Sequence, residues 1–375
     1  MHGDYPVVVY GASGYTGRLV IEFLREYGIP FIAAGRSRSR IEEALKYIPG
    51  IESAHYQIVE VEHTLASLTE AFSGKRVICN TVGPFARFGE VTIEASLAAG
   101  CHYVDTTGEQ AWMLEMQEKF HHKFERAGLV CSPATAYMFT VSDIAARVCL
   151  ETPGIDSLEV RVHTFGTPTV GSTQSVFDMC RNPSYQIIDH QLVPYDKTFE
   201  RHELVLPGSG DIVMGNQWGG GSHVVYFNND SRVRNCNMVL AMGNQDIWKG
   251  CEELEQAYNV QLQWLDDEQL FPLLDQLAGN MQNTMPPREN RQQNRFTDWC
   301  VGKGNNKSVR CEITGTCAYQ ITGLLQAYAA MRLIKGTPAQ VGFCSINEVL
   351  GHRNVLGALE AYGYASMNEY KESGQ

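Results

Sequence analysis

The sequence has no long apolar run and no tract of positive charge. No stretch has the apolar length that a membrane-spanning helix requires. The formal net charge is −12, and the lysine and arginine residues do not gather where they could follow a phosphate backbone. The first residues also lack the basic segment and apolar run of a secretory leader. We therefore expect a cytoplasmic protein with no membrane span and no nucleic-acid partner.

The cysteine residues form no recognisable framework. There are 11 of them, scattered singly, with no C-x-x-C, and the nearest pair is Cys311 and Cys317. An odd number without metal-ligand spacing is typical of reduced, buried thiols rather than of disulfides or a zinc site. We expect no metal site.

The composition is that of a folded globular protein. The chain has 375 residues, of which 44% are hydrophobic and 19% are charged. These values exclude a disordered or fibrous chain. At about 150 residues per domain, the length favours two domains.

The first half alternates short apolar runs with amphipathic segments. Residues 7–10 are typical of a buried strand, apolar residues then recur at helical spacing, and residues 31–34 are a second strand. Further strands are predicted at residues 56–61, 77–81, 102–105 and 128–131, and helices at 65–72, 91–99 and 112–126. This alternation predicts an α/β fold with a Rossmann-type, doubly wound parallel sheet.

Beyond residue 143 apolar and polar residues alternate. Residues 158–162 and parts of 203–206 and 222–227 are predicted strands, and frequent Gly, Pro and Asn indicate long loops. We expect a second, α+β domain with a mainly antiparallel sheet. Because residues 322–334 are apolar at helical spacing, the carboxy-terminal segment is expected to return to the first domain. The predicted division is 1–143, completed by about 320–375, and 144–319.

A glycine-rich loop follows the first strand directly. Residues 11–17 read GASGYTG and open a helix. The glycines allow a tight turn and a close backbone approach, and the helix start offers N–H groups to a pyrophosphate. The position between a strand and an amphipathic helix favours dinucleotide binding over a structural turn. The loop residues expected at the cofactor are Gly11, Ala12, Ser13, Gly14, Tyr15 and Thr16.

The second strand ends in a basic segment where an NAD site would place an acid. Residues 35–40 read GRSRSR. A carboxylate there would bind the ribose 2′-OH, whereas an arginine with a neighbouring hydroxyl can bind a 2′-phosphate. We therefore expect NADP (NADPH) as the cofactor, with Gly35, Arg36, Ser37 and Arg40 near its 2′-phosphate. The alternative is a solvated basic turn.

Two further loops follow predicted strands of the same half. The first contains Thr81, Val82, Gly83, Pro84 and Phe85, and the second contains Asp105 and Gly108. Ligands of doubly wound sheets lie beyond the carboxyl ends of the strands, so both loops are expected to contact the cofactor. The alternatives are an ordinary Gly-Pro turn and an acid that caps the next helix.

Taken together, these motifs resemble the saccharopine dehydrogenase-like (saccharopine reductase-like) oxidoreductase superfamily, which includes trans-acting enoyl reductases. The matching pieces are VVYGASGYTG at residues 8–17, AGRS at 34–37, NTVGPF at 80–85 and YVDTTGE at 103–109. The resemblance covers roughly the first 145 residues and the last 40. It implies an NADP-binding Rossmann domain, a second α/β domain over the nicotinamide, and hydride transfer to a C=N or C=C bond.

The sequence departs from this family after Cys131. Residues 132–137 read SPATAY where relatives often carry a Gly-Phe-Asp-like stretch. Candidate proton donors are therefore chosen from the residues alone. Tyr137 follows a predicted strand and has a phenolic hydroxyl, and His223 begins a predicted strand of the second domain. The alternatives are a core tyrosine and a core or surface histidine.

The function expected from these features is NADPH-dependent reduction of an unsaturated small molecule, either an enone-type C=C or an imine C=N. The predicted second domain would bind this substrate, which is expected to be partly apolar. Two alternatives stay open: an amine or opine-type dehydrogenase, and an NADPH-binding sensor without turnover. A homodimer is expected only because dimers are the commonest assembly.

Overall fold

The computed structural model describes residues 5–195, 201–217 and 221–373. The chain forms two compact units. The first comprises Met1–Thr107, Glu115–Thr140 and Tyr319–Leu359, and the second comprises Gly108–Leu114, Val141–Ala318 and Glu360–Gln375. Each unit contains a β-sheet of its own.

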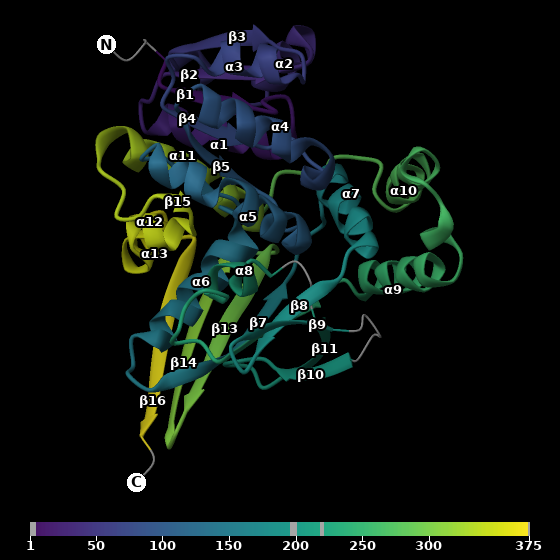
Figure 1. Ribbon diagram of the computed structural model, residues 1–375, viewed down its shortest axis with the longest axis vertical. Helices are drawn as coiled ribbons and strands as arrows, with labels where there is room; N and C mark the ends of the chain where they lie inside the picture. The colour runs from purple at the N-terminus through teal and green to yellow at the C-terminus, as the bar shows by residue number, and fades with distance from the viewer. Residues whose placement is uncertain (1–4, 196–200, 218–220, 374–375) are drawn as a thin grey trace. The chain divides into compact units, whose positions relative to one another are not determined.

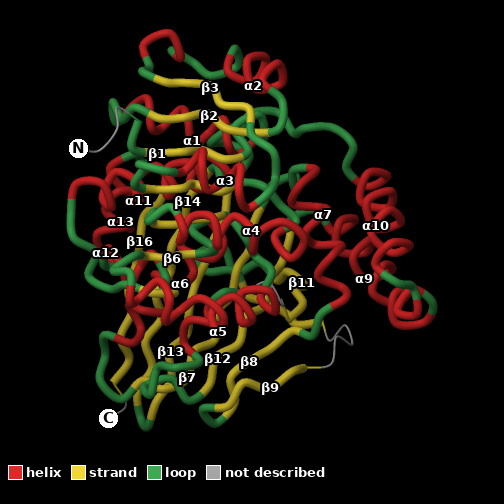
Figure 2. The backbone as a smooth tube through the Cα atoms, turned by 45° about the horizontal axis from the view of Figure 1, so that its top comes forward, coloured by secondary structure: helices red, strands yellow, loops and turns green. Residues whose placement is uncertain are grey.

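The first unit contains a seven-stranded sheet in which every pairing is parallel. Its strand order is β15-β6-β5-β4-β1-β2-β3, and Figure 2 shows β1, β2 and β3 side by side. The strands are β1 (Val7–Tyr10), β2 (Phe31–Gly35), β3 (Tyr56–Glu60), β4 (Val77–Asn80), β5 (His102–Asp105), β6 (Val130–Ser132) and β15 (Gly342–Phe343). The order 3-2-1-4-5-6 is that of a Rossmann fold, so the predicted fold class is confirmed.

Helices connect these strands or lie directly before or after them along the chain, and some of them extend into the second unit (Figure 1). They are α1 (Tyr15–Glu26), α2 (Arg38–Leu45), α3 (Leu65–Phe72), α4 (Phe85–Ala98), α5 (Gln110–Arg126), α6 (Tyr137–Leu150), α11 (Ala318–Lys335), α12 (Ile346–Leu350) and α13 (His352–Ala361), with the 3-10 helix η1 (Ile51–Ser53). Every residue of strands β1 and β4 is buried, because strands in a parallel sheet are covered on both faces. This burial fixes the strand ends, from which the loops of the site emerge.

The second unit contains a nine-stranded mixed sheet. The path is β10-β11-β12-β7-β13-β14-β16, with β8 paired to β12 and β9; β7 and β12 are parallel and the other pairs antiparallel. The strands are β7 (Ile155–Thr164), β8 (Ser184–Ile188), β9 (Gln191–Tyr195), β10 (Arg201–Val205), β11 (Ile212–Gln217), β12 (Asn235–Met242), β13 (Arg295–Gly304), β14 (Lys307–Thr316) and β16 (Ala365–Ser373). A mainly antiparallel second sheet was predicted, and this prediction is confirmed.

Three helices of the second unit pack on one another (Figure 1). A small apolar core that includes Phe177, Leu254 and Leu274 joins α7, α9 and α10. The helices of this unit are α7 (Val170–Asp178), α8 (His223–Phe227), α9 (Gln245–Val260) and α10 (Asp267–Met281), with η2 (Met179–Arg181) and η3 (Leu262–Trp264). Among the described residues, no helix combines the length and apolar character needed to cross a bilayer.

Two segments differ from the prediction. Residues 222–227 were predicted as a strand, but His223–Phe227 form the helix α8, whose five residues are all buried. Burial on every side removes the periodicity that would distinguish a helix from a strand. The end of the chain also differs: residues 319–359 lie in the first unit, but β16 pairs with β14 and so lies in the second.

The cysteine residues are all free thiols, and ten of the eleven are buried. Cys251 is the partly exposed one. Burial raises the pKa of Cys101, Cys236 and Cys251 to about 12, so these thiols are protonated at neutral pH.

Candidate functional site

The turn after β1 is held against the end of β2. The N–H groups of Gly11 and Ala12 both donate to the carbonyl of Ala34, and Gly14 N–H donates to the carbonyl of Gly11. Gly11 has φ +93°, a conformation that side chains other than glycine rarely adopt. The predicted loop residues are therefore placed together at the carboxyl ends of β1 and β2.

Two of the three glycines of the loop, Gly11 and Gly17, leave no room for a side chain, and Gly14 is closely packed. A Cβ on Gly11 would lie 2.5 Å from Thr81 Oγ1, and one on Gly14 would lie 3.2 Å from the carbonyl oxygen of Gly11. A Cβ on Gly17 would overlap that same oxygen and lie 3.0 Å from Ala12 Cα. The glycines thus let the helix start close behind the turn, as dinucleotide-binding loops require.

Helix α1 begins without a side-chain cap. Its N-cap is Gly14, which has no side chain to accept a hydrogen bond, and the N–H of Arg18 is the donor to the Gly14 carbonyl. The N–H groups of Thr16 and Gly17 precede that bond, so they have no helical acceptor. By contrast, Ser37 caps α2 and Thr64 caps α3. An uncapped helix start of this kind is suited to bind an anion.

The loop after β4 lies beside the glycine turn. Thr81 Oγ1 donates to the carbonyl of Tyr10 over 3.0 Å, and Val82 N–H donates to the side chain of Asn80. Thr81, Val82 and Gly83 are half-buried, whereas Pro84 and Phe85 are buried where α4 begins. The structure therefore brings the first part of this predicted segment to the glycine turn.

Some residues of the basic segment after β2 make hydrogen bonds or ion pairs within the protein, and others make none. Arg38 donates to the carbonyl of Ile58 and pairs with Glu42. Ser37 Oγ caps α2 by accepting from Arg40 N–H, and Gly35 is the buried last residue of β2. Within the described chain, the exposed side chains of Arg36 and Arg40 have no hydrogen bond or ion pair. These two guanidinium groups are therefore available to a phosphate.

His63 is a residue of this edge that sequence reasoning missed. It lies three residues beyond the end of β3, and its Nδ1 is 2.8 Å from the hydroxyl of Tyr10, the last residue of β1. Its ring is stacked on that of Tyr10 and lies edge-to-face with Phe88 of α4. One signal for His63 was present in the sequence, which is its position shortly after the end of a strand. Many other loop residues have such a position, so the signal did not single out His63.

Two causes lower the pKa of His63. Burial is the larger one, and the positive charge of Arg36 is the second. Burial raises the pKa of Tyr10 to about 12, and Arg36 opposes this shift slightly. The charge of Arg36 thus acts on both rings.

Asp105 is a buried clamp between loops. Its carboxylate accepts from the N–H groups of Thr107 and Ala134, each over 2.9 Å, and from the hydroxyl of Tyr103 over 2.8 Å. It is 0% exposed. The side chain of Gln326 in α11 bridges the carbonyls of Asp105 and Thr135. Asp105 was expected to contact the cofactor; the structure shows it holding the loops after β5 and β6, and direct contact stays a prediction.

Gly108 and the two candidate proton donors are placed in different parts of the fold. Gly108 is half-buried between β5 and α5 and belongs to the second unit. Tyr137 begins α6 in the first unit, is 4% exposed, and donates its N–H to Thr322 Oγ1. His223 begins α8 in the second unit, where its Nε2 is 2.9 Å from Ser142 Oγ. Burial lowers the pKa of His223 to about 4, which keeps its imidazole neutral at pH 7.

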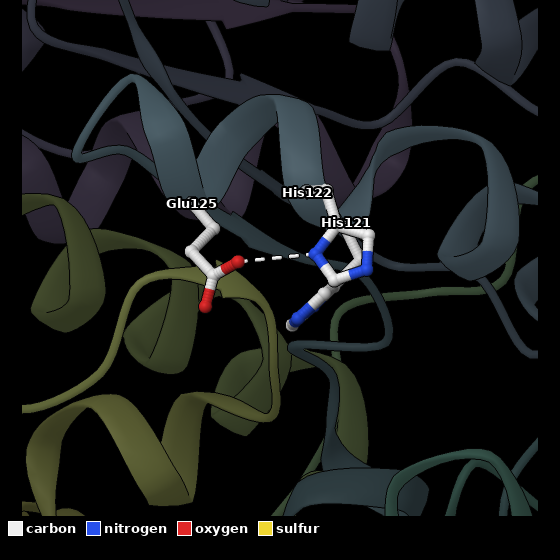
Figure 3. A group of neighbouring side chains, drawn as sticks. All are labelled: His121, His122 and Glu125. Carbon is white, nitrogen blue, oxygen red and sulfur yellow. Dashed lines mark hydrogen bonds and ion pairs between the residues drawn. The ribbon is translucent and has the colours of Figure 1, made fainter.

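A group of two histidines and a glutamate on α5 has the composition of a metal site. Figure 3 shows His122 paired with Glu125 over 3.1 Å, with His121 beside them. Nδ1 of His121, however, accepts the N–H of Phe343, so the neutral ring carries its proton on Nε2. Neither nitrogen of His121 then offers a lone pair to a metal, and its bond to Phe343 anchors β15 instead.

The residues of this edge fit a dinucleotide that carries a 2′-phosphate. The glycines leave the backbone of this turn uncovered, and the start of α1 has no side-chain cap, which are two features that a pyrophosphate site requires. An unpaired guanidinium stands after β2, where the 2′-substituent of the adenosine ribose is recognised in such folds. No carboxylate occupies that position.

Comparison with known proteins agrees with this geometry. Residues 7–132 match the family model described as “Saccharopine dehydrogenase NADP binding domain”. Residues 140–369 match the one described as “Family of unknown function (DUF5938)”. The resemblance predicted from the motifs is therefore confirmed over residues 7–132.

Three curated relatives match the chain over part of its length. A “Lipid droplet localized protein” of Caenorhabditis elegans is 32% identical over 38% of this chain and 35% of its own length. A “Putative trans-acting enoyl reductase” of Mycobacterium tuberculosis is 30% identical over 38% and 34%, respectively. A human “Saccharopine dehydrogenase-like oxidoreductase” is 32% identical over 33% and 32%. Each alignment thus spans about a third of the relative.

The family model of unknown function matches residues 140–369, which is more than half of the sequence. The NADP-binding model matches residues 7–132 and ends with β6. In this chain, residues 140–369 follow a segment that matches the saccharopine dehydrogenase NADP binding domain. The chain therefore belongs to the family described as “Family of unknown function (DUF5938)”.

Proposed function

We propose that the protein is an NADPH-dependent oxidoreductase that reduces an enone-type C=C or an imine C=N bond of a partly apolar small molecule. The observation that carries the proposal is the uncapped start of α1 behind GASGYTG, together with the unpaired guanidinium of Arg36 one strand away. The first feature supports dinucleotide binding, and the second favours NADPH over NADH.

The chain's own residues would bind and orient the cofactor. The loop from Gly11 to Thr16 would hold the pyrophosphate, and Arg36 and Arg40 the 2′-phosphate. The loops after β4 and β5 would lie at the nicotinamide half, because they follow strands on the opposite side of β1 from β2. When bound, NADPH supplies the hydride.

The proton would come from a side chain with a dissociable hydrogen. Tyr137 is the better candidate, because its neutral phenol carries a proton that it can give to the developing negative charge, which leaves a phenolate behind. His223 is the weaker one, since an imidazole with a pKa of about 4 holds no extra proton at pH 7. We retain Tyr137 as the proposed donor.

The names of two relatives bear on the acceptor bond. One is named as a putative trans-acting enoyl reductase and another as a saccharopine dehydrogenase-like oxidoreductase. The two names favour different acceptor bonds, C=C and C=N. An amine or opine-type dehydrogenase is therefore the second candidate, and a cofactor-binding sensor without turnover is the third.

An absorbance screen distinguishes these candidates. NADPH oxidation is followed at neutral pH with enones, cyclic imines, ketones and a keto acid plus an amine as acceptors. The proposal expects turnover with an enone or an imine. Turnover only with the keto acid and amine would support the opine-type alternative, and tight NADPH binding without any turnover would support the sensor.

The donor is tested by Tyr137→Phe, with Tyr47→Phe as the matched control because Tyr47 is 67% exposed on the first unit. Loss of kcat by about 10²–10⁴-fold with unchanged NADPH affinity in Tyr137→Phe alone would support the assignment. Equal kcat in both variants would refute it. The cytoplasmic location and the homodimer stay predictions, for microscopy and light scattering respectively.

A further inference from the structure

His63 is placed where the mechanism above gives it no task. It follows β3, its ring touches Tyr10 at the end of β1, and its edge faces Phe88 of α4. Strands β3, β2 and β1 are neighbours in that order, so their carboxyl ends form the adenosine half of the dinucleotide-binding edge. The imidazole is therefore on the same side of the site as Arg36.

One nitrogen of this imidazole is buried without a hydrogen bond. Nε2 of His63 makes no hydrogen bond of standard geometry to any described residue, although the main chain of Phe88 lies close enough to raise the pKa of the ring. A buried polar atom left without a partner costs about 1–3 kcal/mol, so a hydrogen bond from Nε2 to a ligand would recover that cost. The residue as a whole is half-buried, but Nε2 itself has almost no exposed surface, so the side chains around it must shift before a ligand can reach it.

Tyr10 suits both protonation states of His63. A tyrosine hydroxyl can donate to Nδ1 of a neutral imidazole, and after rotation it can accept from the Nδ1–H of an imidazolium. The Tyr10 phenol is 1% exposed and keeps its proton throughout the neutral range, because burial raises its pKa to about 12. Protonation of His63 therefore leaves the bond to Tyr10 intact.

The groups around His63 explain what protonation costs and what would offset it. Tyr10 approaches from β1, Arg36 from beyond β2, and the ring and main chain of Phe88 from α4, while Glu62 precedes it and is exposed. Burial and the charge of Arg36 both oppose the imidazolium. A phosphate dianion between the two would offset the repulsion, because each cation would then face a negative charge.

We propose that His63 and Arg36 together bind the 2′-phosphate of NADPH, and that His63 takes up a proton when this phosphate binds. This inference rests on the proposed function and adds a regulatory consequence. Discrimination in favour of NADPH against NADH would grow as the pH falls toward 6, because the bound state holds one proton more than the free protein.

The test compares the wild-type protein with His63→Gln, which keeps a hydrogen-bond donor but cannot become charged. His122→Gln is the matched control, because His122 lies exposed on α5. NADPH, NADH, 2′,5′-ADP and 5′-AMP are titrated by calorimetry at pH 6 and pH 8, in two buffers of different ionisation enthalpy. The 2′-phosphate titrates near pH 6 itself, and comparison of variants with the same ligand cancels that effect.

We expect His63→Gln to weaken NADPH and 2′,5′-ADP by about tenfold at pH 6 and by less at pH 8. Its affinity for NADH and 5′-AMP should stay within about twofold, and the His122→Gln variant should match wild type throughout. The wild-type protein should take up more protons per NADPH at pH 6 than His63→Gln does.

Equal losses for NADPH and NADH would overturn the inference, and so would proton uptake that is the same in both proteins. A thermal melt without ligand shows that each variant is folded. If wild type binds neither dinucleotide, the proposed function itself fails. If wild type prefers NADPH but His63→Gln behaves like wild type, this inference alone fails.

Discussion

A side chain on Gly17 would collide with the carbonyl oxygen of Gly11, because helix α1 starts directly behind the turn that Gly11 forms. This relationship places the first helical turn where a pyrophosphate can reach its N–H groups. The spacing of the two glycines in GASGYTG is therefore a steric requirement of the site.

Gly17→Ala should destabilise the first unit and weaken cofactor binding. The added methyl group must displace the turn, which costs about 1–3 kcal/mol. NADPH affinity should fall by about tenfold or more, because the N–H groups move with the turn. Gly357→Ala in α13 is the control: a Cβ there meets nothing within 4 Å, so the change should be neutral or stabilise by up to about 1 kcal/mol. Urea unfolding and NADPH titration measure both effects, and equal behaviour of the two variants would contradict the steric account.

Arg36→Asp should reverse the cofactor preference. The substitution removes a guanidinium from the 2′-phosphate and adds a carboxylate that can bind a ribose 2′-OH instead. We expect NADPH to bind about 10–100-fold more weakly, with NADH unchanged or tighter. The control is Arg38→Gln, since Arg38 is engaged with Ile58 and Glu42. An unchanged preference for NADPH in Arg36→Asp would refute the assignment of the 2′-phosphate.

Asp105→Asn should loosen the loops after β5 and β6. An amide cannot accept from Thr107, Ala134 and Tyr103 together, because its NH₂ group faces at least one donor. The expected loss of unfolding free energy is about 3 kcal/mol, since buried donors are left unpaired. Tyr103→Phe removes the hydroxyl alone and should cost about 1–2 kcal/mol. If Asp105→Asn proved the milder change in urea unfolding, the clamp would not be what holds these loops.

His223 should make the second unit sensitive to acid. Its pKa is about 4 in the folded protein, below the usual value of 6.5, so the unfolded chain binds the proton more readily. Stability is therefore unaffected above pH 6.5 and is lost as the pH falls from 6.5 toward 4. Between pH 7.5 and pH 5 this residue should cost about 2 kcal/mol. His223→Gln should remove that part of the loss, measured by urea unfolding at both pH values, and an identical loss in the variant would contradict it.

The Rossmann unit could be predicted from the sequence because its signals are local. A strand, a glycine-rich turn and an amphipathic helix follow one another within residues 7–26, and a helix was predicted at residues 65–72, where α3 is found. Each of these elements is fixed by neighbours in the chain.

Other features depend on residues far apart in sequence and left no local signal. The pairing of β16 with β14 joins residues 365–373 to 307–315, and no pattern in either strand specifies its partner. Residues 223–227 are apolar throughout, so their pattern fits a strand and a helix equally.

Candidate residues could be chosen from the sequence where chemistry follows from position, and were overlooked where it depends on three-dimensional contacts. Arg36 was identified because it replaces an acid at a defined place after β2. His63 was not, since its contact with Tyr10 spans 53 residues. Ser37 was expected at a phosphate, and its hydroxyl also accepts the N–H of Arg40 as the cap of α2, so contact with a phosphate stays a prediction.

Isothermal calorimetry of the purified protein with NADPH and with NADH tests the central claim most directly. The account predicts binding of one NADPH per chain, with an affinity at least about tenfold higher than for NADH, because a guanidinium and not a carboxylate follows β2. Heat from neither dinucleotide on the folded protein would contradict the account.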